Sequence, residues 1–165
     1  MTITPQISKH LHDVFFGNNW TGTNYTEVLK DITWEEATRQ ISDYNTILKL
    51  VFHTQYFIKA IIPVLDGKEL DAHDKFSFDH PMISSETDWQ QLLITIYADV
   101  ELLASKIEKL SDEKLVTDFA DSKYGNYYRN LHGIIEHCHY HLGQIVIIKK
   151  LIRNSVFNNL NQGGT

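Results

Sequence analysis

The chain has 165 residues, an apolar fraction of 42% and a formal net charge of −6. This length suits one domain with a substantial hydrophobic core, so we expect residues 1–165 to form a single domain. Because the lysines and arginines are scattered along an acidic chain, they exclude an extended phosphate backbone as the partner, and we expect no binding to nucleic acid.

The cysteine content and the hydropathy pattern address the cellular location. The single cysteine, Cys138, cannot form an internal disulfide and fits a reducing compartment. The N-terminal residues lack the basic start and the apolar run of a signal peptide. No run of ~20 uninterrupted apolar residues indicates a membrane span. These features predict a cytoplasmic protein with no membrane partner.

The first predicted helix begins at Thr4, which is the expected N-cap, with Pro5 at the first helical position. It runs to about Phe16, where Gly17 and two asparagines favour a stop. We expect residues 20–32 to form a loop.

A second, long helix is predicted from the capping box formed by Thr33 and Glu36. Apolar residues recur at three- and four-residue spacing from Ile41 to Ile62, which is typical of one helical face. The helix should end near Pro63, and residues 68–85 form a polar loop that could cover the end of the domain.

The last two long helices are also bounded by recognisable signals. A third helix should start around Ser85 and carry apolar residues on one face as far as Ile107. Ser111 resembles the cap of a short extra turn. The fourth helix is expected from about Gly125 to about Arg153.

Four long helices without a strand pattern predict an all-α fold, and specifically a four-helix bundle. The long segments 17–32 and 67–85 indicate crossover connections between the helices. A simple up-down-up-down order of the helices is therefore not assured.

Nine histidines are present, which makes metal or proton chemistry a priority. His137 and His141 are four residues apart on the fourth helix, so their imidazoles leave one face only ~40° apart and can reach one metal ion. His53, in the middle of the second helix, is the natural third ligand. Three histidines with open coordination positions are typical of a catalytic metal site, since a structural zinc site uses four protein ligands.

The angular positions of the histidines on their helices limit which of them can share a metal. A histidine on a buried face can also be a hydrogen-bonded core residue, and His53 lies at the flank of its apolar stripe. His139 and His132 lie ~200° and ~140° around the helix from His137, so neither can share its metal. We expect His139 to face solvent or a partner subunit, and Cys138 to be a small core residue.

Residues near His137 and His141 suggest further roles in or around a metal site. A di-iron bundle requires two Glu-x-x-His motifs, whereas the chain has one, which ends at the outward-facing His139. Gln144, Asn130 and Tyr140 are candidates for contacts around the metal, with Gln144 at the best angle. Gly143 is expected to allow close helix packing.

The segments around these histidines resemble the DinB-like, or bacillithiol-transferase-like, superfamily. The resemblance rests on Leu-Val-Phe-His-Thr-Gln around His53 and on His-Cys-His-Tyr-His-Leu-Gly-Gln-Ile from His137, and it covers nearly the whole chain in helix order. It implies a four-helix bundle that binds a divalent metal, zinc or nickel, through His53, His137 and His141. It also implies a homodimer and an activity with low-molecular-weight thiols and small electrophiles.

The leading functional hypothesis is a metal-dependent thiol S-transferase, in which the metal lowers the pKa of a substrate thiol. A metal-dependent hydrolase is the enzymatic alternative, although no inward carboxylate is evident as its base. A metal-binding homodimer without catalysis is the other alternative, and no catalytic acid or base is assigned. Because ligating histidines must be neutral, metal affinity should fall below pH ~6.5.

Overall fold

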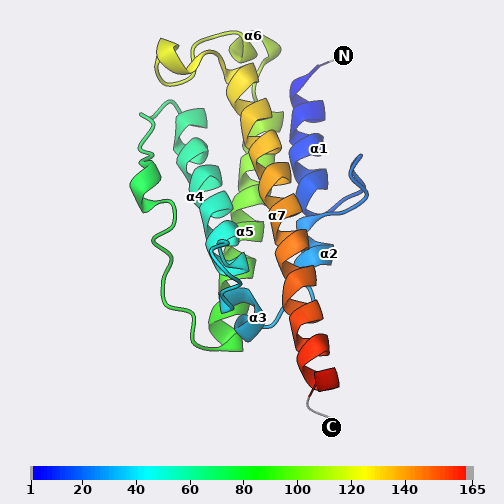
Figure 1. Ribbon diagram of the computed structural model, residues 1–165. Coiled ribbons are helices and arrows are strands. Elements are labelled where there is room, and N and C mark those ends of the chain that lie inside the picture. The colour runs from blue at the N-terminus through cyan, green and yellow to red at the C-terminus, as the bar shows by residue number, and fades with distance from the viewer. Residues whose placement is uncertain (1, 163–165) are drawn as a thin grey trace.

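The computed structural model describes the backbone of residues 2–162 and the side chains of residues 2–155. Over this range the protein is all-helical, with seven α-helices, two 3-10 helices and no β-strand (Figure 1). The α-helices are α1 (Thr4–Phe15), α2 (Tyr25–Leu29), α3 (Trp34–Thr38), α4 (Ile47–Leu65), α5 (Glu86–Glu108), α6 (Asp112–Leu115) and α7 (Tyr127–Gln162). The 3-10 helices are η1 (Asp74–Phe76) and η2 (Ser122–Tyr124).

The four longest helices enclose the hydrophobic core. Helix α1 packs on α5 and α7, and α4 packs on the same two helices. In Figure 1, α4 and α5 run in one direction while α1 and α7 run in the other. The segment 66–85 must therefore return along the outside of α4 before α5 can begin, which confirms the predicted crossover there. The segment between α1 and α4 joins two helices that run in opposite directions and lie diagonally across the bundle, with α5 and α7 between them. The connection expected at residues 17–32 therefore crosses the end of the bundle and does not return along a helix.

The segment predicted to be a loop at residues 20–32 contains a helix. Helix α2 begins after Asn24, whose side-chain oxygen accepts a hydrogen bond from the Glu27 backbone N–H at 2.8 Å. It buries Tyr25, Val28 and Leu29 against the core. A helix of five residues spans too few turns to show a periodic pattern, and tertiary burial is what stabilises it.

The predicted second helix is divided into two. The capping box of Thr33 and Glu36 is present as expected, but α3 ends at Thr38. A new helix, α4, begins after Thr46, whose hydroxyl accepts from the Lys49 backbone N–H. Between them Ser42 has a φ of +46°, which a continuous helix cannot contain. The spacing of apolar residues does not indicate this break, because both α3 and α4 bury apolar residues in the core.

Other helix boundaries agree with the capping signals or extend beyond them. Ser85 and Ser111 cap α5 and α6 as predicted. Thr4 is instead the first residue of α1, after the N-cap Ile3, and the Asp112 carboxylate accepts from the Ile3 backbone N–H. Helix α7 continues to Gln162, beyond the expected end near Arg153.

Helix α4 is apolar along most of its length. Its residues Ile47–Leu65 have a mean hydropathy of 1.3, so by length and composition they could cross a membrane, contrary to the sequence-based expectation. Within the described part of the chain, it is the one helix with this property. About half of this stretch (44%) is buried inside the protein, as in the core helix of a helical domain.

A buried tyrosine connects the two helices that carry the predicted ligands. The Tyr25 hydroxyl donates to the carbonyl oxygen of Cys138 on α7 at 2.9 Å and lies 3.2 Å from the Thr54 hydroxyl oxygen on α4. Thr54 and Cys138 directly follow His53 and His137 in the sequence. The hydroxyl of Tyr25 therefore sets the separation of α4 and α7 next to these histidines.

Replacing this tyrosine tests its role in joining the helices. Tyr25→Phe should lower the free energy of unfolding by about 1 to 2 kcal/mol, because it leaves buried partners without their hydrogen bond. Urea denaturation of the metal-free protein measures this change. Tyr128→Phe removes the hydroxyl of a tyrosine that is 45% exposed and should leave stability within error. Equal losses in the two variants would contradict the assignment.

Candidate metal centre

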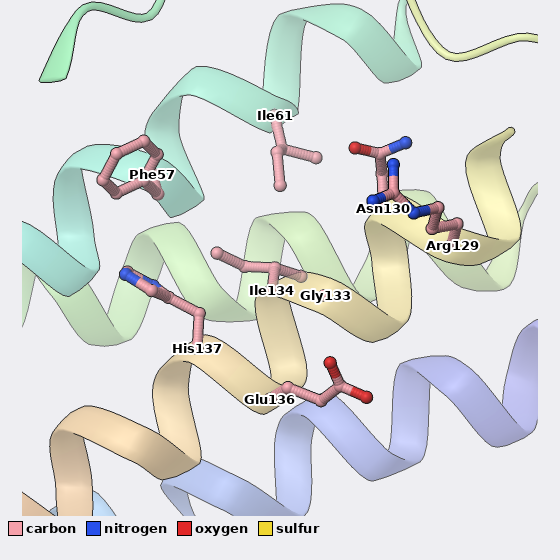
Figure 2. A pocket seen from close by; sticks show the side chains of 8 residues that line it. All are labelled: Phe57, Ile61, Arg129, Asn130, Gly133, Ile134, Glu136 and His137. Carbon is pink, nitrogen blue, oxygen red and sulfur yellow. The ribbon is translucent and has the colours of Figure 1, made fainter. Parts of the chain in front are cut away.

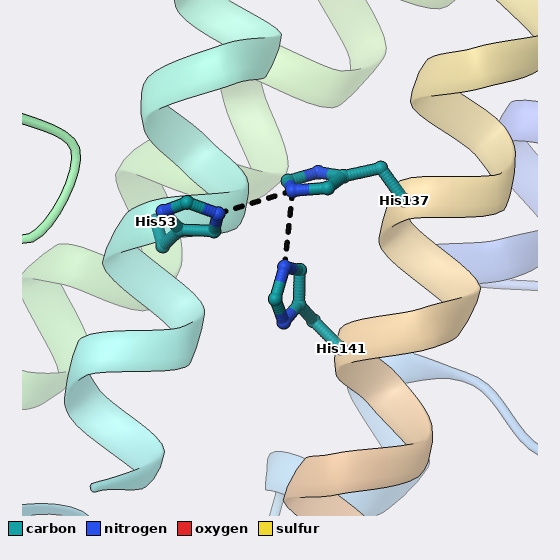
Figure 3. Close-up of side chains that lie close together, drawn as sticks. All are labelled: His53, His137 and His141. Atoms are coloured by element: carbon teal, nitrogen blue, oxygen red, sulfur yellow. Dashed lines mark hydrogen bonds between the residues drawn. The ribbon is translucent and has the colours of Figure 1, made fainter. Parts of the chain in front are cut away.

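His53, His137 and His141 meet between α4 and α7 (Figure 3). The Nε2 atom of His137 lies 3.1 Å from Nε2 of His53 and 3.0 Å from Nε2 of His141. One ligand nitrogen from each of the three residues lies within 4.8 Å of the others. The structure therefore brings together all three predicted ligands in a group that could hold a metal ion.

Hydrogen bonds to the Nδ1 atoms of His53 and His141 determine which tautomer each imidazole adopts. The Ser77 hydroxyl donates to the Asp74 carbonyl at 2.7 Å, so its oxygen accepts from the Nδ1–H of His53 at 3.0 Å. The Gln144 side-chain oxygen accepts from the Nδ1–H of His141 at 2.7 Å. A neutral imidazole has one N–H group, so the Nε2 atoms of both histidines carry lone pairs that point inward.

Too few N–H groups point into the centre to form a hydrogen bond at each short contact between nitrogens. His137 can donate an Nε2–H to only one of its two neighbours, so at least one of the two short contacts between nitrogens is not a hydrogen bond. If His137 carries its proton on Nδ1 instead, three inward lone pairs face one another. A divalent cation that accepts all three lone pairs removes this repulsion. Three imidazole donors suit a divalent transition metal, and the two outer hydrogen bonds are of the kind that orients histidine ligands in metal sites.

Burial keeps these histidines in the form that binds metal. Loss of solvation, followed by the influence of His141 and His53, lowers the pKa of His137 to about 4. Burial also lowers the pKa of His53 and of His141. All three are therefore neutral near pH 7 and carry a lone pair that a metal can use.

The segment 66–85 covers the exposed side of His53. The Phe78 ring stacks on the imidazole of His53 with centroids 4.2 Å apart and an interplanar angle of 12°. The Tyr56 hydroxyl holds the segment to α4 through both the N–H and the carbonyl of His73. Ser77 is only 1% exposed, so this crossover is packed against the site and completes it.

Of the residues predicted from the sequence to lie around the metal, some contact the histidines in the structure and others do not. Gln144 contacts His141 as predicted. Tyr140 is 65% exposed, and its ring lies beside that of His141 without pointing into the site. The prediction that Gly143 allows close helix packing is wrong, because a Cβ atom at this position would meet nothing within 4 Å.

Ser77 and Phe78 were missed by sequence reasoning. They lie in an irregular loop, where no periodic spacing indicates which side chains turn inward. A polar residue between two aromatic residues, Phe76 and Phe78, is the one local sign that this part of the loop packs on the domain.

The remaining histidines lie outside the group. His139 packs beside His10 on α1, with ring centroids 6.0 Å apart, so it is partly covered by its own chain. His132 lies beside Tyr128, and His80 contacts Phe52. The exclusion of His139 and His132 by their angles on α7 is consistent with this arrangement.

A hollow of about 370 Å³ opens beside His137 (Figure 2). Phe57, Ile61 and Ile134 form its apolar walls, and Arg129 and Asn130 lie at the end away from His137. A second hollow of about 500 Å³ shares Phe57, Ile61 and Asn130 with the first. His137, one of the three candidate ligands, therefore lines a space large enough for a small molecule.

Two carboxylates lie closer to this region than the sequence suggested. Glu136 lines the hollow beside His137, and Asp74 lines the second hollow and influences the pKa of His53. In Figure 2 the Glu136 side chain points away from the imidazole of His137. Glu136 is exposed, so its position is consistent with the expectation that no carboxylate of α4 or α7 points inward at the histidines.

Comparison with protein-family models, with curated proteins and with solved structures finds no match to this chain. The geometry of the three histidines and of the adjoining hollow is therefore the basis for a functional assignment.

The lowered pKa values predict acid sensitivity of the metal-free protein. His137 has a pKa of about 4 when folded and ~6.5 when unfolded, so the unfolded chain binds more protons between these values. The free energy of unfolding should fall by roughly 1 to 3 kcal/mol as the pH drops through this window. Denaturation curves at pH 7 and pH 4.5 measure the loss. His137→Gln should reduce it, whereas the same change at the exposed His73 should not.

Removing the hydroxyl that orients His53 should weaken metal binding. Ser77→Ala is expected to lower zinc affinity about 10- to 100-fold, because the outer hydrogen bond that fixes the imidazole is lost. Competition with a chromophoric chelator measures the affinity. Ser122→Ala, at an exposed serine of η2, is the matched control and should bind zinc as the unmodified protein does. Unchanged affinity in Ser77→Ala would show that His53 is oriented by other contacts.

Proposed function

We propose that this protein binds zinc or nickel through His53, His137 and His141 and acts as a metal-dependent thiol S-transferase. The observation that carries the proposal is the convergence of three Nε2 atoms, two of which present lone pairs fixed from outside by Ser77 and Gln144. A cation at this position satisfies nitrogens that protons alone cannot satisfy.

The proposal includes the fold and family that the sequence resembles. The packing of α1, α4, α5 and α7 around one core supports a four-helix bundle of the DinB-like type. The positions of His53 on α4 and of His137 and His141 on α7 agree with the helices to which that resemblance assigns them. A cytoplasmic homodimer, with a low-molecular-weight thiol as one substrate, belongs to the same proposal.

The open side of the histidine group supports an enzymatic role. Three protein ligands leave coordination positions for a substrate, and the hollow beside His137 gives a small molecule access to them. A metal held there supplies Lewis acidity that lowers the pKa of a thiol and favours the thiolate. The adjoining hollow, which shares walls with the first, offers room for the electrophile.

The residues of the chain then position the reactants. The apolar walls formed by Phe57, Ile61 and Ile134 exclude water from the substrate and hold it beside the ligands. In the reaction, the thiol sulfur forms a bond to an electrophilic carbon, and the leaving group departs with its electron pair. The thiol proton passes to solvent.

A metal-dependent hydrolase is the second candidate, and one observation favours it. Glu136 lines the hollow next to a metal ligand, where a carboxylate could accept a proton from an attacking water. In Figure 2, however, its side chain is turned away from His137. A screen of ester and amide substrates without thiol tests this candidate, and turnover that Glu136→Gln abolishes would favour it over thiol transfer.

Elemental analysis of the purified protein tests the metal site. The unmodified chain should contain about one zinc or nickel ion, and the His137→Ala/His141→Ala double variant should contain none. His53→Ala should also lose the metal, and His139→Ala is the matched control that should keep it. A metal-free protein after incubation with zinc and nickel, or equal loss in His139→Ala and His53→Ala, would contradict the proposal.

Activity is measured on the metal-loaded protein with a panel of small thiols and a chlorinated nitroaromatic or an epoxide as electrophile. We expect turnover that requires both the thiol and the metal and is absent in the double variant. A metal-loaded protein that is inactive across the panel would instead support a metal-binding protein without catalysis.

A further inference from the structure

The hollow beside His137 has features of a binding site for one class of ligand. Its volume of about 370 Å³ lies in the range of small-molecule pockets. One end is formed by His137 and the other by Arg129 and Asn130, with apolar side chains between them (Figure 2). A ligand that fills it needs an apolar body.

A glycine in the wall of this hollow has no packing explanation. Gly133 lies in the interior of α7, where glycine destabilises a helix by about 1 kcal/mol relative to alanine. A Cβ atom at Gly133 would meet nothing within 4 Å, so no neighbouring group excludes a side chain there. Because Gly133 lines the hollow, its missing side chain leaves room for a ligand.

The charge at the far end of the hollow indicates an anionic group on the ligand. Arg129 is the only lysine or arginine among the described residues that line it. Its Nη1 atom donates to the Tyr124 carbonyl at 2.8 Å, and no described carboxylate forms an ion pair with it. The guanidinium is thus held in place with donors remaining, which suits a carboxylate.

The other polar side chains that line the hollow further limit which ligands fit it. The Asn130 side-chain amide donates to two backbone carbonyls, those of Tyr124 and Asn126, so it leaves anion binding to Arg129. Among the described residues, Glu136 is the one carboxylate that lines the hollow, and its charge disfavours a second acidic group on the ligand. The site therefore suits a monoacid.

The helix itself gives the length of the ligand. Arg129 and His137 are eight residues apart on α7, which places their Cα atoms roughly 12 Å apart along the axis. A ligand whose carboxylate contacts Arg129 reaches His137 with a group at the opposite end of a chain of this length.

We propose that the hollow binds a small monocarboxylate with an apolar body, held by Arg129 at its acidic end and accommodated by Gly133 along its length. The assignment of the opposite end as the reacting thiol rests on the proposed function. The carboxylate subsite depends only on residues of the hollow and is testable without metal.

Calorimetric titration tests the subsite with three probes of similar length: 8-mercaptooctanoate, octanoate and 8-mercaptooctanol. Each is titrated into zinc-loaded and zinc-free protein. Octanoate should bind both forms, and 8-mercaptooctanoate should bind the zinc-loaded form more tightly than octanoate does. The neutral alcohol should bind about 10- to 100-fold more weakly than the thiol acid, because it lacks the charge-assisted hydrogen bonds to Arg129.

Matched variants separate the contributions. Gly133→Leu fills the hollow and should weaken all three probes at least about tenfold, while Gly143→Leu should not. Gly143 is also interior to α7 with no neighbour within 4 Å, but it lies outside the hollow. Arg129→Gln should weaken the two acids and leave the alcohol unchanged. Thermal melts of each variant confirm that the fold is retained.

The outcomes distinguish this proposal from the proposed function. Octanoate binding that Gly133→Leu abolishes supports the subsite even in a protein that never binds metal, a result that would refute only the metal-dependent activity. Failure of both acids to bind a zinc-loaded protein overturns the subsite and leaves the metal centre intact. Equal binding of acid and alcohol, unaffected by Arg129→Gln, overturns the assignment of an anionic ligand.

Discussion

The arrangement of the site depends on a shortage of protons among three imidazoles. Ser77 and Gln144 each take up the N–H of the histidine that they contact, so the inner nitrogens of His53 and His141 have only lone pairs to offer. In a low-dielectric interior this arrangement is unfavourable unless a positive charge lies at the centre. The outer hydrogen bonds therefore direct the lone pairs of His53 and His141 toward the centre even in the metal-free protein, and this arrangement favours binding of a cation there.

The helices around the site maintain this arrangement against relaxation. The Tyr25 hydroxyl contacts α4 and α7 one residue beyond His53 and His137, on the buried side of the histidine group. On the outer side, Phe78 and Ser77 hold the ring of His53 between the crossover segment and α7. Because the His53 ring is held from both sides, it stays directed at the two histidines of α7.

The sequence predicted those parts of the structure that depend on local hydrogen bonds and on helical geometry. Ser85, Ser111 and the pair Thr33–Glu36 marked helix starts correctly, because capping involves residues within one turn. The i,i+4 spacing placed His137 and His141 together, and the angle of Gln144 predicted its contact. These predictions need no knowledge of how the helices pack.

Features set by distant segments were not predictable in this way. The break between α3 and α4 leaves the apolar periodicity intact, so only the tertiary structure reveals it. Ser77 contacts His53 across 24 positions of sequence, through a loop without regular geometry. His53 was expected as the third ligand from its place in a second apolar helix, but its position at the flank of the apolar stripe also fitted a surface residue. The family resemblance favoured the first interpretation.

The three histidines differ in how firmly they are held. His141 is fixed by Gln144 on its own helix and His53 by Ser77 from the crossover segment, whereas the buried Nδ1 atom of His137 has no partner among the described residues. The ring without an outer hydrogen bond is also the one that lines the hollow. The rings of His53 and His141 are therefore fixed in orientation, whereas the ring of His137 is less constrained. An occupant of the hollow would therefore contact the one imidazole of the three whose orientation no outer hydrogen bond fixes.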